Sequence, residues 1–252
     1  MSRRLSRLAP GIALATLLAA CSTNPVTGEK ELMLVGESTE LSIGAQQYAP
    51  MRQSEGGTYV MDPALTSYVQ QVGNRLAAVS DRKLPYEFSV LNNSIPNAWA
   101  LPGGKIAVNR GLLVQLESES ELAAVLGHEI VHAAARHSAQ QMSRGMLVQG
   151  GLLVAQVAAS DSDYGNLYMA GAGLAAQLTM QKYGRDAELE SDRYGMDYMR
   201  RAGYDPQGAV SLQETFLRMS GNKDSSWLAG LFASHPPSQE RLDANRRYAA
   251  KL

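Results

Sequence analysis

Two histidines and a glutamate stand close together in an apolar stretch of the chain, as His128-Glu129-Ile130-Val131-His132. Residues four positions apart lie on one face of a helix, so both imidazoles can reach the same metal ion. Glu129 lies about 100° further around that helix, where its carboxylate can act on a water molecule without being a ligand. This HExxH pattern is typical of zinc hydrolases, and a buried glutamate with two histidines needs such a partner. The alternative is a surface helix that carries two histidines by chance.

A third ligand is available in the acidic run from Glu188 to Asp192. Glu188 and Asp192 lie one helical turn apart, and Glu188 is predicted to complete a His2Glu zinc site that keeps one position open for water. Asp192 is predicted to accept the free N–H of a ligating histidine. Glu190 points to the other side of the helix and is expected to be solvated. Two alternatives remain: the run is a charged helix face, or the zinc is structural and needs a fourth permanent ligand.

The helix that carries the HExxH pattern has a clear start. Ser118 and Glu121 form a capping box, and apolar residues at helical spacing follow it. A second helix, predicted over residues 165–201, carries the acidic run. Asp62 followed by Pro63 indicates another helix start. Further helices are predicted over residues 38–53, 206–219 and 239–250.

The region between residues 86 and 109 has the period of strands. Tyr86, Phe88 and Val90 alternate with polar residues, which predicts a half-buried strand, and a second strand is predicted over Lys105–Asn109. Helices flanking a small sheet make a mostly helical α+β domain, and no linker indicates a second one. We therefore predict one domain over residues 37–252.

One long apolar segment stands apart from these elements. Residues 146–176 are rich in Gly, Ala, Leu and Met and are interrupted by Asp161 and Asp163. The two halves are too short and too often broken by Gln and Gly to span a membrane. The favoured interpretation is a helical hairpin with mobile packing. The alternatives are a lid over the cleft and a membrane-contacting surface.

The first 21 residues have the pattern of an export signal. Residues 1–7 contain three arginines and no acid, residues 11–20 are apolar but too short to span a bilayer, and Cys21 follows small residues. We predict a signal peptide over residues 1–20 and lipidation of Cys21. The alternative is a signal peptide with a chance cysteine. Residues 21–36, which contain Pro and Gly, are predicted to be a lipidated tether.

The composition excludes several classes of protein. Hydrophobic residues make up 45% and charged residues 19%, an ordinary balance that excludes a disordered chain. With 23 basic and 24 acidic side chains the formal net charge is −1, so no nucleic-acid partner is indicated. A single cysteine excludes an internal disulfide.

Five stretches of the chain together resemble the M48 family of zinc metalloproteases. They are NPVTGE at residues 24–29, NAWALPGG at 97–104, HEIVHAAARH at 128–137, ELESD at 188–192 and SHPP at 234–237. The resemblance implies a zincin-like fold, one Zn²⁺ per chain on His128, His132 and Glu188, and Glu129 as the catalytic carboxylate. Asp192 falls where the family is often assigned a proton donor, so we count it as a catalytic candidate, although its spacing favours an orienting role. The C-terminal helical-repeat domain and the transmembrane helices of other members have no counterpart here, so repeat-mediated partners are not implied.

The resemblance also implies a biological setting. The chain is similar to periplasmic quality-control lipoproteins. The resemblance implies an endopeptidase that is lipid-anchored to the outer membrane, faces the periplasm and degrades misfolded or unassembled envelope proteins. An extended region over residues 99–108 is implied to form an edge strand that holds an extended substrate by main-chain pairing. The rival class is a chaperone-like binding protein for outer-membrane protein assembly with little turnover.

Two other histidines fall in the family motifs. His137 lies off the metal-binding face and is expected to be a structural or helix-end residue. The resemblance implies that the loop of His235 and Pro236 lies near the zinc, where a neutral imidazole can occupy the open position and keep the enzyme latent. The alternatives are a loop histidine that caps the next helix and a direct catalytic role.

Overall fold

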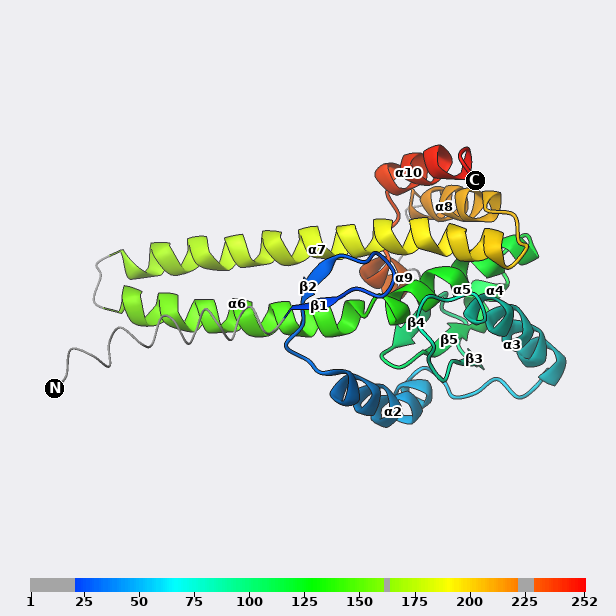
Figure 1. Cartoon of the computed structure of the whole chain (residues 1–252), viewed down its shortest axis with the longest axis horizontal. Coiled ribbons are helices and arrows are strands. Elements are labelled where there is room, and N and C mark those ends of the chain that lie inside the picture. Colours follow the sequence, from blue (N-terminus) through cyan, green and yellow to red (C-terminus); the bar gives the residue numbers. More distant parts are fainter. Residues whose placement is uncertain (1–20, 161–163, 222–228) are drawn as a thin grey trace.

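The computed structural model describes residues 21–160, 164–221 and 229–252. The signal peptide predicted over residues 1–20 lies outside the described residues. Figure 1 shows two parts, a body of helices around a small sheet and a long pair of antiparallel helices that extends from it. The predicted mostly helical α+β class is confirmed.

The central helix of the body is α5 (Glu119–Ala134), which carries the HExxH pattern. The predicted N-cap is present, because Ser118 Oγ accepts from the Glu121 backbone N–H at 3.1 Å. The reciprocal half of the capping box is displaced by one residue, since Glu121 Oε2 accepts from the Glu117 N–H at 2.7 Å rather than from that of Ser118. Nearly all of its side chains are buried, because α3 (Pro63–Ala77), α7 (Gly165–Arg201) and α8 (Gln207–Ser220) pack around it. An apolar helix of this kind is stable only inside a core.

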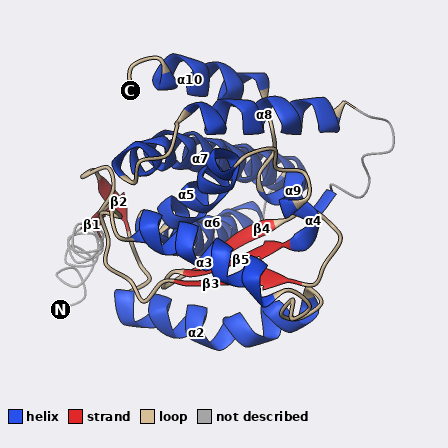
Figure 2. Cartoon of the chain, turned by 90° about the vertical axis from the view of Figure 1, so that its right-hand side faces the viewer, coloured by secondary structure: helices blue, strands red, loops and turns tan. Residues whose placement is uncertain are grey.

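The sheet has three strands in the order β3-β5-β4. β3 (Glu87–Leu91) runs parallel to β5 (Lys105–Asn109), and β4 (Ala98–Leu101) runs antiparallel to β5. α2 (Glu37–Ser54) covers one face, and α3 and α5 cover the other (Figure 2). The prediction of a single edge strand over residues 99–108 is wrong, because Gly103 and Gly104 turn the chain at positive φ between two strands. Of the two strands in this region, β4 lies at an edge of the sheet and β5 is central.

The helices predicted from sequence are present, with boundaries that agree within two residues. α7 (Gly165–Arg201) spans 37 residues, and α8 (Gln207–Ser220) and α10 (Gln239–Ala249) lie side by side on the body (Figure 1). Asp62 caps α3 as predicted, since its Oδ1 accepts from the Ala64 and Leu65 N–H groups. Two short helices were not predicted, α4 (Arg110–Leu113) and α9 (Ala229–Ser234).

α6 (His137–Ala159) and the first half of α7 form the extended pair, which we call the arm. The helical hairpin predicted around residues 146–176 is therefore present (Figure 1). Many apolar side chains of the arm are exposed, among them Leu153, Val154, Val157, Leu167 and Leu174. Among the described residues, no helix is both long enough and apolar enough to cross a bilayer.

The stretch predicted to be a tether contains a folded hairpin. β1 (Cys21–Thr23) pairs antiparallel with β2 (Lys30–Leu32), and the turn between them is closed by Asn24, whose Oδ1 accepts from the Val26 N–H at 2.9 Å. After the hairpin, the Leu34 N–H donates to Ser143 Oγ of α6 at 2.9 Å. Pro and Gly are signals of linkers and of turns alike, and here they serve a turn.

A buried ion network ties α2 to the end of α5. Glu40, 1% exposed, accepts from Arg82 at 2.9 Å and from Arg136 at 2.6 Å. Arg136 has a left-handed backbone, with φ of 65°, and separates α5 from α6. The chain therefore changes direction immediately after the HExxH helix.

Candidate metal centre

α5 and α7 cross at close range, and this crossing assembles the centre. A Cβ atom on Gly127 would lie 3.2 Å from the Gly195 carbonyl oxygen, and one on Gly195 would lie 3.2 Å from the His128 amide nitrogen. Two glycines at the crossing point therefore let the backbones approach. As a result the acidic face of α7 lies opposite the histidines of α5.

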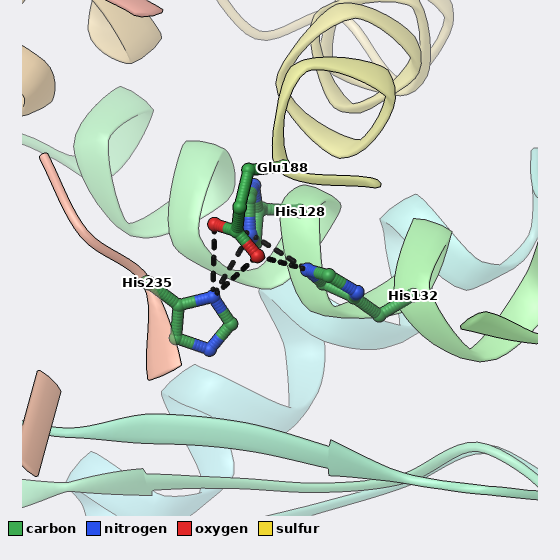
Figure 3. Close-up of side chains that lie close together, drawn as sticks. All are labelled: His128, His132, Glu188 and His235. Carbon is green, nitrogen blue, oxygen red and sulfur yellow. Dashed lines mark hydrogen bonds and ion pairs between the residues drawn. The ribbon is translucent and has the colours of Figure 1, made fainter. Parts of the chain in front are cut away.

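Four predicted residues converge at this crossing (Figure 3). His128 and His132 place their Nε2 atoms 2.9 Å apart, as expected for neighbours on one helical face. Glu188 lies between them, with Oε2 3.3 Å from His128 Nε2 and Oε1 3.2 Å from His132 Nε2. His235, which follows α9, brings Nδ1 to 3.1 Å from Glu188 Oε2. One ligand atom from each residue lies within 4.8 Å of all the others.

Glu129 lies beside this group without joining it. Its side chain is 3% exposed, and its Oε1 lies 3.5 Å from His235 Nε2. A cleft bounded by Trp99 and Ala100 of β4 reaches Glu129, His132 and His235, and an apolar pocket lies on the other side of Glu129. The pocket is lined by Val125, Leu212, Phe216 and Leu231. Glu129 therefore lines both the cleft and the smaller apolar pocket.

Asp192 contacts His128 on the side away from the other ligand atoms. Its Oδ1 lies 2.9 Å from His128 Nδ1, the nitrogen that faces away from the other ligands. Arg241 of α10 holds the same carboxylate with two bonds, Nε to Oδ2 at 2.8 Å and Nη2 to Oδ1 at 2.6 Å. Arg241 Nη1 also donates to Glu188 Oε2 at 2.9 Å and to the Pro236 carbonyl at 3.2 Å. One buried guanidinium thus fixes α7, α10 and the loop of His235.

The ionisable groups of the site shift one another's pKa values. Burial opposes a charge on Glu188, but His128 and the other imidazoles outweigh it and hold the pKa of Glu188 well below its ordinary value. Burial likewise opposes a charge on His128, yet Glu188 and Asp192 raise the pKa of that imidazole to about 10. Burial lowers the pKa of His132 to about 3, so this ring is neutral and has a free lone pair. Two ionised carboxylates therefore surround imidazole donors, and three imidazoles with a carboxylate are a donor set that suits zinc and similar divalent ions.

Sequence reasoning missed three features of the site. Arg241 was not identified, and the only signal for it was its place beside Leu242 on the buried face of α10. The expectation that Glu190 is solvated is wrong: its side chain is 22% exposed and contacts His137. His137 is the first residue of α6, but it is also within hydrogen-bonding distance of His132.

A small mixed sheet, an HExxH helix and a facing acidic helix define a zincin-like domain of the metalloprotease class. The chain belongs to peptidase family M48, which matches residues 63–249. Membership in this family implies a metal ion, and the group of His128, His132, Glu188 and His235 is able to bind one.

Two similar proteins come from Escherichia coli K12. The beta-barrel assembly-enhancing protease is 31% identical over 92% of this chain and 51% of its own length. The metalloprotease YcaL is 31% identical over 89% of this chain and 92% of its own length. The mitochondrial metalloendopeptidase OMA1 of Schizosaccharomyces pombe is 35% identical over 70% of this chain and 51% of its own length. The chain therefore spans about half the length of the first of these relatives and nearly all of the second.

Proposed function

We propose that this chain is a zinc-dependent endopeptidase that degrades misfolded or unassembled proteins of the bacterial envelope. The observation that carries the proposal is the convergence of His128, His132 and Glu188 beside the buried Glu129 in a chain of family M48. In this proposal these three side chains hold one Zn²⁺ per chain. When bound, the ion supplies Lewis acidity to a water molecule and to the scissile carbonyl.

Glu129 is the general base of the proposed reaction. Its carboxylate takes a proton from the attacking water and passes it to the leaving amine. Its position outside the ligand group keeps it available for this transfer, and burial strengthens its interaction with the reacting atoms. Asp192, the second catalytic candidate, has both oxygens engaged by His128 and Arg241, which supports an orienting role rather than proton donation.

His235 is proposed as a reversible fourth ligand that keeps the enzyme latent. Its Nδ1 faces Glu188 and lies 3.3 Å from His128 Nε2. Pro236 and Pro237 restrict the chain after it, and Arg241 holds the Pro236 carbonyl. Hydrolysis of unfolded casein by His235→Ala tests this role: latching predicts a gain of activity, and a direct catalytic role predicts a large loss. An unchanged rate would leave the loop with a structural role only.

The substrates proposed are unfolded or loop-exposed protein segments. β4 is one of the two edge strands of the sheet, and its Trp99 and Ala100 line the cleft that reaches Glu129. An extended chain can pair with such an edge through main-chain hydrogen bonds. The name of the beta-barrel assembly-enhancing relative supports envelope proteins as the substrate class.

A lipid at Cys21 is the proposed anchor to the outer membrane, with the domain in the periplasm. Cys21 is exposed and starts β1, so its thiol is accessible. Detergent-phase partitioning of the wild-type protein against Cys21→Ala tests the anchor. If Cys21→Ala is exported and still fractionates with membranes, the arm rather than a lipid holds the protein there.

The decisive test of the enzyme is Glu129→Gln, with Glu119→Gln in the exposed first turn of the same helix as the control. Removing the general base should lower casein hydrolysis at least 10²-fold while zinc content stays near one per chain. The same variant, purified with what it traps, identifies the substrates. A chaperone-like binding protein, the alternative function, would keep its cellular role in Glu129→Gln cells.

A further inference from the structure

The outward-facing nitrogen of His132 is not directed to solvent. His132 Nδ1 lies 2.9 Å from Nδ1 of His137, and the two rings meet edge to face at 79°. His137 Nε2 in turn lies 3.2 Å from Glu190 Oε1. The His137 side chain is 8% exposed, so water does not compete freely for these contacts. A second imidazole therefore stands between His132 and the nearest carboxylate on this side.

The donors and acceptors along this row have one consistent assignment. If His132 offers Nε2 to the metal, its proton is on Nδ1 and is donated to His137 Nδ1. His137 then carries its own proton on Nε2 and donates it to Glu190. In this assignment each N–H has an acceptor, and Glu190 Oε1 accepts from His137.

The row ends in the N-terminal hairpin. Asn24 is completely buried, and its Nδ2 donates to Glu190 Oε1 at 3.1 Å. The amide oxygen of Asn24 is used inside the turn, where it accepts from the Val26 N–H, so the amide is held from both ends. The hairpin is itself fixed to α6 by a pair between Glu31 and Arg144 at 2.8 Å.

The two histidines of α5 are thus supported in different ways. The Nδ1 atom of His128 contacts the carboxylate of Asp192 directly. The Nδ1 atom of His132 reaches a carboxylate through His137, because the left-handed backbone of Arg136 separates α5 from α6 and turns His137 back toward the centre. Partners of this kind fix the tautomer and ring orientation of a metal-ligating histidine.

We propose that His137, Glu190 and Asn24 are positioning residues for the metal ligand His132, which makes the N-terminal hairpin a structural part of the metal centre. This inference rests on the proposed zinc site. It assigns residues 21–32 a role in metal binding and not only in spacing the domain from an anchor.

The test measures zinc affinity by chelator competition and the visible absorption of the Co²⁺-loaded protein, on the full chain. His137→Phe keeps a ring of similar size but removes the acceptor and the donor, and should weaken zinc binding about 10- to 100-fold and shift the Co²⁺ bands. His137→Asn, which restores an acceptor near the position of Nδ1, should recover part of the loss. Asn24→Ala should weaken binding less than His137→Phe.

Glu31→Gln is the matched control, because it loosens the hairpin from Arg144 without touching the row. It should bind zinc as the wild type does. The inference is overturned if His137→Phe and Asn24→Ala keep wild-type affinity and Co²⁺ bands, whatever their melting temperature. It is also overturned if Glu31→Gln weakens binding as much as Asn24→Ala, since docking of the hairpin alone would then suffice.

Two further results also have a defined meaning. If His137→Phe shows no cooperative melting, Asn24→Ala and Glu31→Gln decide between the two explanations. If the wild-type protein itself binds no zinc, the proposed function fails first, and this inference fails with it.

Discussion

α7 is one continuous helix whose two halves have opposite surroundings. From Gly165 to Gln181 it has no charged side chain, and apolar residues such as Leu167 and Leu174 are more than half exposed. All of its buried residues lie further on, at Glu188, Ser191, Asp192, Gly195, Met196, Tyr198 and Met199. The apolar half is therefore exposed, and the buried residues of the helix, two carboxylates among them, lie in the charged half.

The difference shows that a side chain of α7 is buried where it has partners in the fold, whether that side chain is polar or apolar. The second half of α7 is buried because Arg241 and the imidazoles of α5 satisfy its carboxylates. The first half has only α6 beside it, and a helix that is apolar all round is normally covered by protein or lipid. Exposed apolar area of this kind marks an interaction surface, so a lid or a membrane contact stays a prediction for the arm.

The largest contrast within α7 is expected between an exposed ion pair near its middle and a buried one further on. Asp192→Ala leaves Arg241 buried without its main partner and should lower the free energy of unfolding by about 3–5 kcal/mol. Lys182→Ala removes the exposed pair of Lys182 with Asp186 in the same helix and should cost at most about 0.5 kcal/mol. Urea unfolding followed by circular dichroism measures both. Equal losses would mean that burial does not set the contribution of these ion pairs.

Truncation of apolar side chains should show the same contrast between buried and exposed positions, with a smaller difference in the free energy of unfolding. Met199→Ala opens a cavity in the core and should cost about 2–5 kcal/mol, because Met199 is fully buried. Leu174→Ala, at a side chain 58% exposed, should change stability by less than about 0.5 kcal/mol. A loss of several kcal/mol at Leu174 would show that the arm packs on something in solution, such as a second copy of the chain.

The glycines of α7 give a still finer test. Gly195→Val forces α5 and α7 apart at their crossing and should cost about 1–3 kcal/mol and weaken zinc binding. A Cβ atom on Gly171 would have no other atom within 4 Å, so Gly171→Val should change stability by less than about 0.5 kcal/mol. Thermal melting with and without added Zn²⁺ separates the two effects. If Gly195→Val binds zinc normally, the close approach of the helices is not needed for the centre.

The smallest change in stability per substituted residue is expected when exposed apolar side chains of the arm are replaced by polar ones. Replacing Val154, Val157 and Leu167 together by Gln should alter the free energy of unfolding by less than about 0.5 kcal/mol for each residue. The same variant, made in Cys21→Ala, should lose any remaining partitioning into detergent. Unchanged partitioning would remove the arm as a membrane-contacting surface.

Local periodicity predicted the centre well because it decides which side chains share a helical face. The pairs His128 with His132 and Glu188 with Asp192 are four residues apart, and this spacing alone brings each pair together. The direction of Glu190 was also correct, since it does point away from Glu188. What lies on that side could not be predicted, because it is the N-terminal hairpin, which meets α7 only in the folded chain.

Arg241 and the order of the strands escaped prediction for a related reason. Arg241 shares its helix with the exposed Arg246, and only the packing of α10 on α7 separates a buried guanidinium from a surface one. The order β3-β5-β4 depends on the parallel pairing of β3 with β5, which passes over β4 and which the alternation of residues within each strand does not specify. Tertiary contacts decided both.

Arg241 also sets an order in time. A ribosome makes the chain from its N-terminus, so the HExxH helix and the acidic helix are both complete before the guanidinium that joins them has been synthesised. Until α10 has folded onto α7, Asp192 and Glu188 lack the partner that holds them toward the histidines. The metal centre is therefore complete only after α10 has folded onto α7, so synthesis of the ligand-bearing helices and the start of catalysis are separate events.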